Sequence, residues 1–408
     1  MPAEITLWVI LGLVVWTIVF PRYLLPSLLI GGLLLGISIL RKNNIRITPI
    51  DLPIVILLCL LPINLLITPT PQETAPQVHR LVLGILLCYA VIFYVRDTSR
   101  LETLFDLNRF LVLGLSIYGL FTIEDVRQIF STFLPDSLDS LLYVINDTVN
   151  ANVLAGSLIV LLPQTLAELP SSWNHQKTYQ RIFSIISIGA GLGLLGLSQS
   201  RGAVIAFVFS VIAMMAVRWR KGRLVAVALT VAMVGFIISS GLPRLLEFVA
   251  NNPGLTGLPG RTEIWRNSII IIQDFPFTGV GMGSFPYVID HLYPILYTLP
   301  QRVQHAHNIY LQIGADLGMV GLVAWLGIVF AVAGGDLRVT MSRAIEKDPI
   351  VTAAAVGCLG GLTALLAHGF FDSVTWGMVR PAPLVWLNWG IGISAYLLFT
   401  KAKSTEVA

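Results

Sequence analysis

The sequence predicts an all-α integral membrane protein with about twelve transmembrane helices and one long, partly helical loop on the outer side of the membrane. Of the 408 residues, 55% are hydrophobic and only 12% are charged, against roughly 45–50% and 25% in soluble domains. The apolar residues also gather into runs of about 20, the length that a helix needs to cross a hydrocarbon core of about 30 Å. The composition therefore excludes a soluble protein.

The predicted spans follow one another along the whole chain and are bounded by charges or by Pro and Gly turns. They cover residues 5–20, 24–40, 50–68, 81–95, 104–123, 150–169, 182–200, 203–217, 224–241, 308–333, 350–371 and 381–400. The fifth span contains Asp106 and Arg109, which could pair with each other, so counts of eleven and thirteen spans stay open.

The positive charges predict the orientation. Sixteen of the 26 Lys and Arg residues, including every lysine, fall on the side of the N-terminus, nine arginines fall on the other side, and Arg109 lies within a span. Because Lys and Arg are retained in short cytoplasmic loops, we expect both termini in the cytoplasm and a multi-pass protein of the inner (plasma) membrane. The N-terminus lacks the positive region of a cleavable signal, so we expect the first span to be retained. No stripe of Lys and Arg with interleaved aromatic residues, which would indicate nucleic-acid binding, is present.

We expect a single membrane domain over residues 1–408 with two long outer loops. Residues 124–149 form a smaller acidic loop, and residues 242–307 form a larger loop that is rich in aromatic residues. Loops of this length are usually functional or disordered, and the aromatic content argues against disorder. Within the larger loop we expect an amphipathic helix over residues 262–273.

The larger loop and the span after it carry spaced Gly, Arg and His residues. The segments are GRTEIWR at 260–266, GVGMG at 279–283, HAHN at 305–308 and GMVG at 318–321. The alternating glycines have no strand before them and are flanked by prolines, so we expect a turn and not a dinucleotide site. Gly314, Gly318 and Gly321 are expected on or near one helix face, where small residues let membrane helices approach closely.

The spacing of His307-Asn308, nine residues and then Gly-x-x-Gly resembles the signature of the O-antigen ligase and O-antigen polymerase superfamily of membrane glycosyltransferases. The segments 200–202 (SRG) and 150–155 (NANVLA) agree with this resemblance, which covers most of the chain as topology and about 201–321 as motif. It implies transfer of a glycan from a lipid carrier, typically undecaprenyl diphosphate, to an acceptor hydroxyl at the periplasmic face, without a cofactor. The acceptor could be lipid A core, a growing polysaccharide or a protein, and the signature favours lipid A core.

Such a transfer needs positive charge to bind the diphosphate and a base to take the hydroxyl proton. Arginine binds phosphate bidentately, and histidine titrates near neutral pH. Arg201 is expected at a helix N-terminus on the outer interface, which is an anion site, and the resemblance adds Arg261 for the donor and His307 as the base. Without the resemblance, Arg201 could be a surface charge and His307 a structural histidine at the interface.

Five further residues are candidate substrate contacts, namely Trp265, Arg266, His305, Asn308 and Asp316. Arg261 and Arg266 would lie on different faces of one helix, so we expect only Arg261 to point inward, with Arg266 a surface charge or a partner for Glu263. Asn308 could cap the helix that follows it. Asp316 replaces the glutamate that the resemblance implies, and its place within a span predicts an arginine partner or, alternatively, a polar network.

No metal is expected. His305 and His307 could form a metal-binding pair, but no third or fourth ligand stands at a suitable spacing in the sequence. Asp372 and Arg380 bracket an outer turn and are weaker candidates for the acceptor side.

A transporter, for example of inorganic carbon, is the main alternative from another class. It would place polar residues at mid-membrane in two repeated halves, whereas this sequence has few charges within spans and no evident internal repeat. The sequence predicts no particular oligomeric state or partner protein.

Overall fold

The computed structural model describes residues 3–42, 46–132, 148–172, 177–240, 257–294, 303–342 and 348–407. Within these ranges all regular elements are helices, and nine of them are long and apolar enough to cross a membrane. This confirms the predicted all-α polytopic class. The count of twelve spans is not confirmed.

The elements follow the predicted spans closely. They are α1 (Ala3–Val19), η1 (Pro21–Tyr23), α2 (Leu24–Lys42), α3 (Asp51–Ile67), α4 (Pro71–Tyr94), α5 (Thr98–Thr122), α6 (Glu124–Ser131), α8 (Ala151–Ser172), α9 (Thr178–Leu197), α10 (Arg201–Arg218), α11 (Arg220–Ser240), α13 (Gly257–Asp274), α14 (Phe285–Leu292), α15 (Ile309–Met341), α16 (Pro349–His368) and α17 (Pro383–Val407). Of the predicted spans, α1 and α3 are shorter apolar helices, and α11 is not among the nine.

The largest boundary difference is at α4, which begins at Pro71 and not at the predicted Leu81. Proline is favoured in the first turn of a helix because it has no N–H to leave unsatisfied there. Hydropathy alone misses this polar first part of the helix. As a result Arg80, which the sequence placed in a loop, lies inside a helix.

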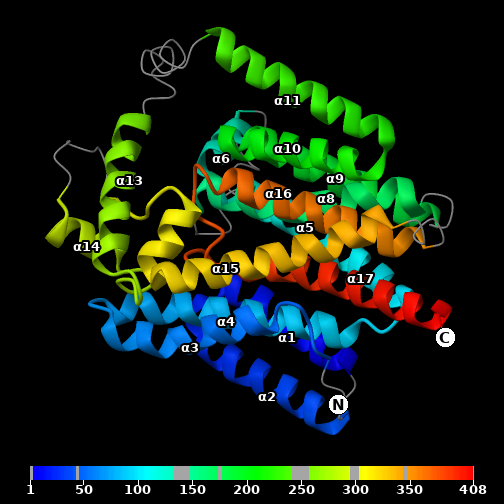
Figure 1. Ribbon diagram of the computed structural model, residues 1–408, viewed down its shortest axis with the longest axis horizontal. Coiled ribbons are helices and arrows are strands. Elements are labelled where there is room, and N and C mark those ends of the chain that lie inside the picture. The colour runs from blue at the N-terminus through cyan, green and yellow to red at the C-terminus, as the bar shows by residue number, and fades with distance from the viewer. Residues whose placement is uncertain are drawn as a thin grey trace.

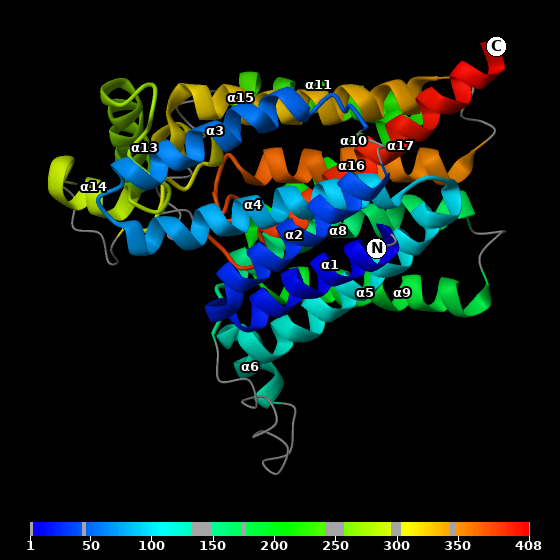
Figure 2. The ribbon, with the colours of Figure 1, turned by 90° about the horizontal axis from the view of Figure 1, so that it is seen from below.

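The helices form a bundle with two distinct ends. Both chain termini lie toward the right-hand side of Figure 1, whereas α13, α14 and the start of α15 lie together at the left. Figure 2 shows the same grouping after a quarter turn. We call the end that holds α13, α14 and the start of α15 the loop end of the bundle.

The helices α8, α16 and α17 lie at the centre and are largely buried. In contrast, α2 and α10 expose apolar side chains such as Leu29, Leu33 and Val208. Exposed apolar faces on long helices suit contact with lipid tails, which need no hydrogen bonds from the protein surface.

A buried ion-pair cluster joins two of the inner helices. Arg109 of α5 is 1% exposed and pairs with Asp106, as the sequence suggested, and with Glu168 of α8. Glu168 has a second bond from the Arg109 Nε, at 3.1 Å. The positive charge inside this span is therefore neutralised by two carboxylates.

The described residues of each long loop include helices. The amphipathic helix expected over 262–273 is confirmed as part of α13, and α14 follows it. The acidic loop begins with α6. Residues 133–147 of the acidic loop and residues 241–256 and 295–302 of the larger loop lie outside the described residues.

Candidate active site

The site begins with an interruption in α15. Gly318 has φ 71° and ψ −177°, which is not helical, and glycine adopts such a backbone without steric cost. The interruption lets α15 bond to the preceding turn: Val280 N donates to Ala315 O at 2.8 Å. On the other side of Gly318, Met319 N donates to Pro276 O at 2.7 Å. Gly318 therefore breaks the helix, which corrects the expectation that it only allows close helix packing.

The glycine-rich segment 279–283 is the predicted turn. Its three glycines have positive φ values of 64°, 103° and 79°, a conformation that side chains with a Cβ rarely adopt. Asn64 of α3 holds the turn against α15, because its Nδ2 donates to Asp316 O at 2.7 Å and its Oδ1 accepts from Met282 N at 2.8 Å. These two hydrogen bonds join the turn and α3 to α15, the helix that follows the histidine segment.

Two non-glycine residues in the described part of the chain have positive φ, Gln199 at 54° and His307 at 48°. Such strained positions cluster at functional sites, where the surrounding structure enforces them. Gln199 lies two residues before Arg201, and His307 is the predicted base. His307 therefore lies within a segment that the sequence singled out, and Gln199 lies immediately before another, the segment 200–202.

Asn308 fixes the direction in which the histidine segment enters α15. Its Oδ1 accepts from the backbone N–H groups of Tyr310 and Leu311, both at 3.0 Å, so the predicted helix cap is confirmed. Its Nδ2 donates to Phe370 O at 3.4 Å. The amide of Asn308 is therefore engaged in positioning the chain.

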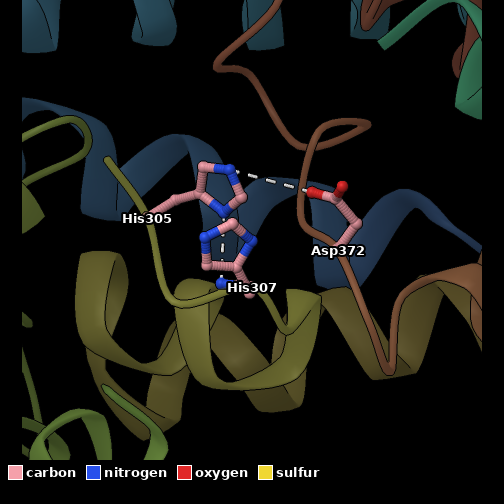
Figure 3. A group of neighbouring side chains, drawn as sticks. All are labelled: His305, His307 and Asp372. Carbon is pink, nitrogen blue, oxygen red and sulfur yellow. Dashed lines mark hydrogen bonds and ion pairs between the residues drawn. The ribbon is translucent and has the colours of Figure 1, made fainter. Parts of the chain in front are cut away.

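Figure 3 shows the two histidines beside Asp372, which follows α16. The ring centroids of His305 and His307 are 4.0 Å apart. His305 Nδ1 accepts from the backbone N–H of His307 at 3.1 Å and lies 2.9 Å from Ser373 Oγ. Since Nδ1 accepts an N–H, the neutral ring carries its proton on Nε2, which lies 3.8 Å from Asp372 Oδ1.

Both imidazoles are neutral at pH 7. Burial lowers the pKa of His305 to about 4, and the positive charge of Arg261 lowers it further. Burial also lowers the pKa of His307 to about 4, with His305 and Arg261 acting in the same direction and Asp372 acting against them. A neutral imidazole can accept a proton, so His307 is in the state that a general base needs.

The helix α13 presents its two arginines differently. Arg261 is half-buried and close enough to both histidines to act on them electrostatically, whereas Arg266 is exposed. This agrees with the expectation that only Arg261 points inward. Trp265 is half-buried and its indole N–H is enclosed without a hydrogen-bond partner among the described residues. No described contact brings Trp265 or Arg266 to the histidines.

Arg201 is the first residue of α10 and is exposed. The end of α16 lies between this helix start and the histidine segment. A Cβ on Gly202 would lie 3.6 Å from the buried ring of His368, and Phe370, just beyond, accepts from Asn308. The sequence gave no role to His368, although a histidine near the end of an apolar span was a possible signal.

Asp316 is fully buried. Its carboxylate accepts from Gln312 Nε2 at 2.8 Å and from Trp376 Nε1 at 3.1 Å. The expected arginine partner is not among these contacts, and the alternative of a polar network is what the structure shows. The reason is local: Gln312 lies one turn earlier on the same helix. Because Gln312 Oε1 accepts from Ala306 N at 2.8 Å, the network reaches the backbone between the two histidines.

The same cluster could hold a metal ion. Ligand atoms of His305, His307 and Asp372 all lie within 4.8 Å of one another. The spacing in the sequence did not reveal Asp372 as a possible third ligand, because Asp372 comes from a distant part of the chain. The positive charge of Arg261 acts on both histidines and opposes the binding of a cation there.

Comparison with known proteins agrees with the motif pattern. A family model described as O-Antigen ligase matches residues 186–326. These residues run from α9 into α15 and contain Arg201, Arg261, His305, His307 and Asp316. No curated protein matches the chain. The match covers less than half of the chain, and it shows that this part of the polytopic membrane protein is similar to the O-antigen ligase family.

Proposed function

We propose that the protein transfers a glycan from an undecaprenyl-diphosphate-type lipid carrier to an acceptor hydroxyl at the periplasmic face of the inner membrane. The family match itself supports a membrane glycosyltransferase of the O-antigen ligase or polymerase type. The observation that carries the finer proposal is a neutral His307 in a strained backbone position, under the electrostatic influence of Arg261. Lipid A core is the proposed acceptor.

Arg201 and Arg261 bind the donor diphosphate in this proposal. Arg201 stands at the N-terminus of the 18-residue helix α10, where the helix dipole favours an anion. Arg261 brings a second positive charge from α13. Two guanidinium groups can bind the diphosphate bidentately and stabilise it as the leaving group.

His307 acts as the base. The acceptor oxygen attacks the anomeric carbon of the glycan, and the bond from that carbon to the diphosphate oxygen breaks. The diphosphate leaves with the electron pair, and the hydroxyl proton passes to the imidazole. Since Nδ1 of His307 is enclosed and has no partner in the described part of the chain, we assign this role to Nε2. One direct displacement inverts the configuration of the anomeric carbon.

Donor binding would strengthen the base. Arg261 is one cause of the low pKa of His307, and a bound diphosphate would offset that positive charge. The pKa of His307 would then rise toward its usual range, where a histidine is more effective as a base at neutral pH. The arrangement thus couples donor binding to activation of the acceptor.

The proposed transfer is independent of metal. Its steps use two arginines and a histidine, and the charge of Arg261 disfavours a cation among His305, His307 and Asp372. Addition of EDTA should leave the rate of transfer unchanged. A loss of activity on chelation that Zn²⁺ or Mg²⁺ restores would instead assign the three residues to a metal centre.

The test is a transfer assay in proteoliposomes that contain the purified protein and an undecaprenyl-diphosphate-linked oligosaccharide. Lipid A core, a free polysaccharide chain and a protein acceptor are offered separately. Transfer to lipid A core alone supports the proposal as stated. Transfer to another acceptor would overturn the choice of lipid A core as the acceptor. If no acceptor is glycosylated while bicarbonate crosses the bilayer in a protein-dependent manner, the transporter alternative takes its place.

A further inference from the structure

A buried glutamine of α15 holds the backbone that carries the two histidines. Gln312 lies in the first turn of α15 and is 1% exposed. Its Oε1 accepts from the N–H of Ala306, six residues earlier, at 2.8 Å. Ala306 is itself fully buried and stands between His305 and His307. Loss of this hydrogen bond would therefore leave a buried N–H without its partner, which is unfavourable.

The backbone at His307 needs such support. Its φ of 48° is a left-handed conformation, which is unfavourable for a residue with a Cβ and persists where neighbouring contacts enforce it. One such contact is the bond from His307 N to His305 Nδ1, at 3.1 Å. The bond from Ala306 N to Gln312 fixes the residue immediately before the strained one. It therefore bears directly on where the imidazole of His307 stands.

Asp316 favours the orientation in which the acceptor end of the Gln312 amide faces Ala306. A glutamine amide has one acceptor end and one donor end, and Gln312 Nε2 donates to Asp316 Oδ1 at 2.8 Å. A reversed amide would place its NH₂ group against the N–H of Ala306 and its oxygen against the carboxylate. Both contacts would then be repulsive, so the carboxylate keeps Gln312 in the orientation that holds the histidine segment.

Trp376 adds a second donor to the same carboxylate. Its indole Nε1 can only donate, and it donates to Asp316 Oδ2 at 3.1 Å. Asp316 thus receives one N–H group on each oxygen. An asparagine has nearly the same shape but offers one oxygen and one NH₂ group, so it would face one of the two donors with a donor. This requirement explains an acidic residue at a fully buried position.

The network is joined to the rest of the site on two sides. On one side, Trp376 N donates to Ser373 O at 3.1 Å, and Ser373 Oγ lies 2.9 Å from His305 Nδ1. On the other side, the main-chain oxygen of Asp316 accepts from Asn64 Nδ2 at 2.7 Å. The turn after α16 and the helix α3 therefore both fix the position of Asp316.

We propose that Gln312 is a positioning residue of the active site and that Asp316 acts through it. Gln312 fixes the backbone at Ala306 and thereby the place of His307, and Asp316 fixes the orientation of the Gln312 amide. Asp316 has this role in place of the expected substrate contact, since it is fully buried and both carboxylate oxygens are engaged. This inference deepens the proposed function and rests on His307 as the base.

The first test measures hydrogen exchange at the N–H of Ala306, a readout that does not depend on activity. Full-length protein in detergent is exposed to deuterated water and fragmented in the mass spectrometer so that this amide is resolved. Gln312→Met keeps the length of the side chain but removes the amide, and it should raise the exchange rate about tenfold. An unchanged rate would overturn the proposal.

The matched control is Gln164→Met, which changes another fully buried glutamine, on α8. It should leave exchange at the N–H of Ala306 at the wild-type rate. A rise as large as that in Gln312→Met would show a general loosening of the protein and would overturn the proposal.

A pair of variants tests the part assigned to Asp316. In Asp316→Asn one donor faces another, so exchange at Ala306 N–H should be faster than in wild type and slower than in Gln312→Met. Adding Trp376→Phe removes the indole donor, which leaves the asparagine oxygen free to accept from Gln312, and exchange should slow again. Wild-type exchange in Asp316→Asn, or a double variant that exchanges no more slowly than the single one, would overturn the role of Asp316.

Kinetics test whether the positioning acts through His307. In the proteoliposome assay Gln312→Met should lower kcat about 10- to 100-fold, because displacement of a reacting group by about 1 Å has an effect of about 100-fold. The KM for the donor should change less than about twofold, because the lost interaction acts in the transition state. In a His307→Ala background the same substitution should have no further effect. A further loss of the full size there would overturn the proposal.

The two readouts separate this proposal from the proposed function. If wild type transfers no glycan, the proposed function is wrong, and hydrogen exchange still decides whether Gln312 fixes the backbone. If wild type is active and His307→Ala is not, but Gln312→Met keeps the wild-type kcat, the proposed function stands and the positioning role is wrong.

Discussion

The arginines in the middle of the bundle and at its loop end have different charged neighbours. In the middle, Arg109 is buried and paired with two carboxylates, Asp106 and Glu168. At the loop end, Arg261 acts on two neutral histidines, and Arg80 lies near Arg380. Opposite charges neutralise each other in the first region, and positive charges are gathered in the second.

The difference separates structural charge from functional charge. A buried ion pair that is fully satisfied has nothing left to offer a ligand, and loss of one partner destabilises the fold because the other charge stays buried. A group of positive charges at a helix end costs stability unless an anion binds. We therefore expect substitution of Arg109 in the middle of the bundle to affect folding and substitution of Arg261 at the loop end to affect activity.

The largest effect on activity among the arginines should come from Arg261. Arg261→Ala should lower kcat/KM for transfer about 100-fold or more, because loss of one group that stabilises developing negative charge has effects of about 10²–10³. Arg266→Ala, an exposed arginine on the same helix, should change it by less than about threefold. Initial rates in proteoliposomes measure both. Equal losses in the two variants would contradict the inward placement of Arg261.

Substitution of Arg109 should affect the stability of the protein, in contrast to substitution of Arg261, which should affect its activity. Arg109→Met should lower the free energy of unfolding by about 3–5 kcal/mol, because it leaves Glu168 buried without its partner. The double variant with Glu168→Met should recover much of this loss. Unfolding in mixed micelles titrated with SDS measures both. Wild-type stability in the single variant would show that the ion pair has no structural role.

The pH dependence should follow the charges around His307. Its pKa is lowered to about 4, so the base stays neutral well below the usual pKa of histidine, and kcat/KM should fall only as the pH approaches 4. Asp372 raises this pKa, so Asp372→Asn should move the fall to lower pH. Arg261→Gln should move it to higher pH, because Arg261 lowers the pKa.

The control for this profile is Asp125→Asn, which changes an exposed carboxylate on α6. Its pH profile should match that of wild type. A fall near pH 6.5 in every variant would mean that another group titrates.

The smallest effect should come from the helix cap. Asn308→Ala should lower the free energy of unfolding by about 1 kcal/mol, the usual contribution of such a cap, whereas Asn308→Asp should keep the bond to the start of α15. The same SDS titration measures both. If the aspartate variant is as unstable as the alanine variant, the capping role is wrong.

Local patterns in the sequence predicted much of this structure. Long apolar runs predicted the helices, the alternating glycines predicted the turn at 279–283, and Asn308 before an apolar run predicted a cap. Each of these features depends on neighbours in the chain. They could therefore be recognised without any knowledge of tertiary contacts.

The features that the sequence missed depend on distant segments. Asp372 joins the histidines because α16 ends beside α15, and Trp376 takes the place of the arginine expected at Asp316 for the same reason. The hydrogen bonds from Arg80 Nη1 to Gly377 O and Met378 O require that α4 begin before Arg80, at Pro71, and that the turn after α16 lie against it. The break at Gly318 could not be distinguished from helix packing, since a glycine in an apolar helix suits both.

The central claim is that the histidine cluster at the loop end performs the transfer. The most direct test compares His307→Ala with His291→Ala, an exposed histidine on α14, in the proteoliposome assay with undecaprenyl-diphosphate-linked oligosaccharide and lipid A core. We predict that His307→Ala lowers the rate by about 10²–10⁴, the usual contribution of a general base, and that His291→Ala retains the wild-type rate. Transfer at the wild-type rate by folded His307→Ala protein would contradict the account.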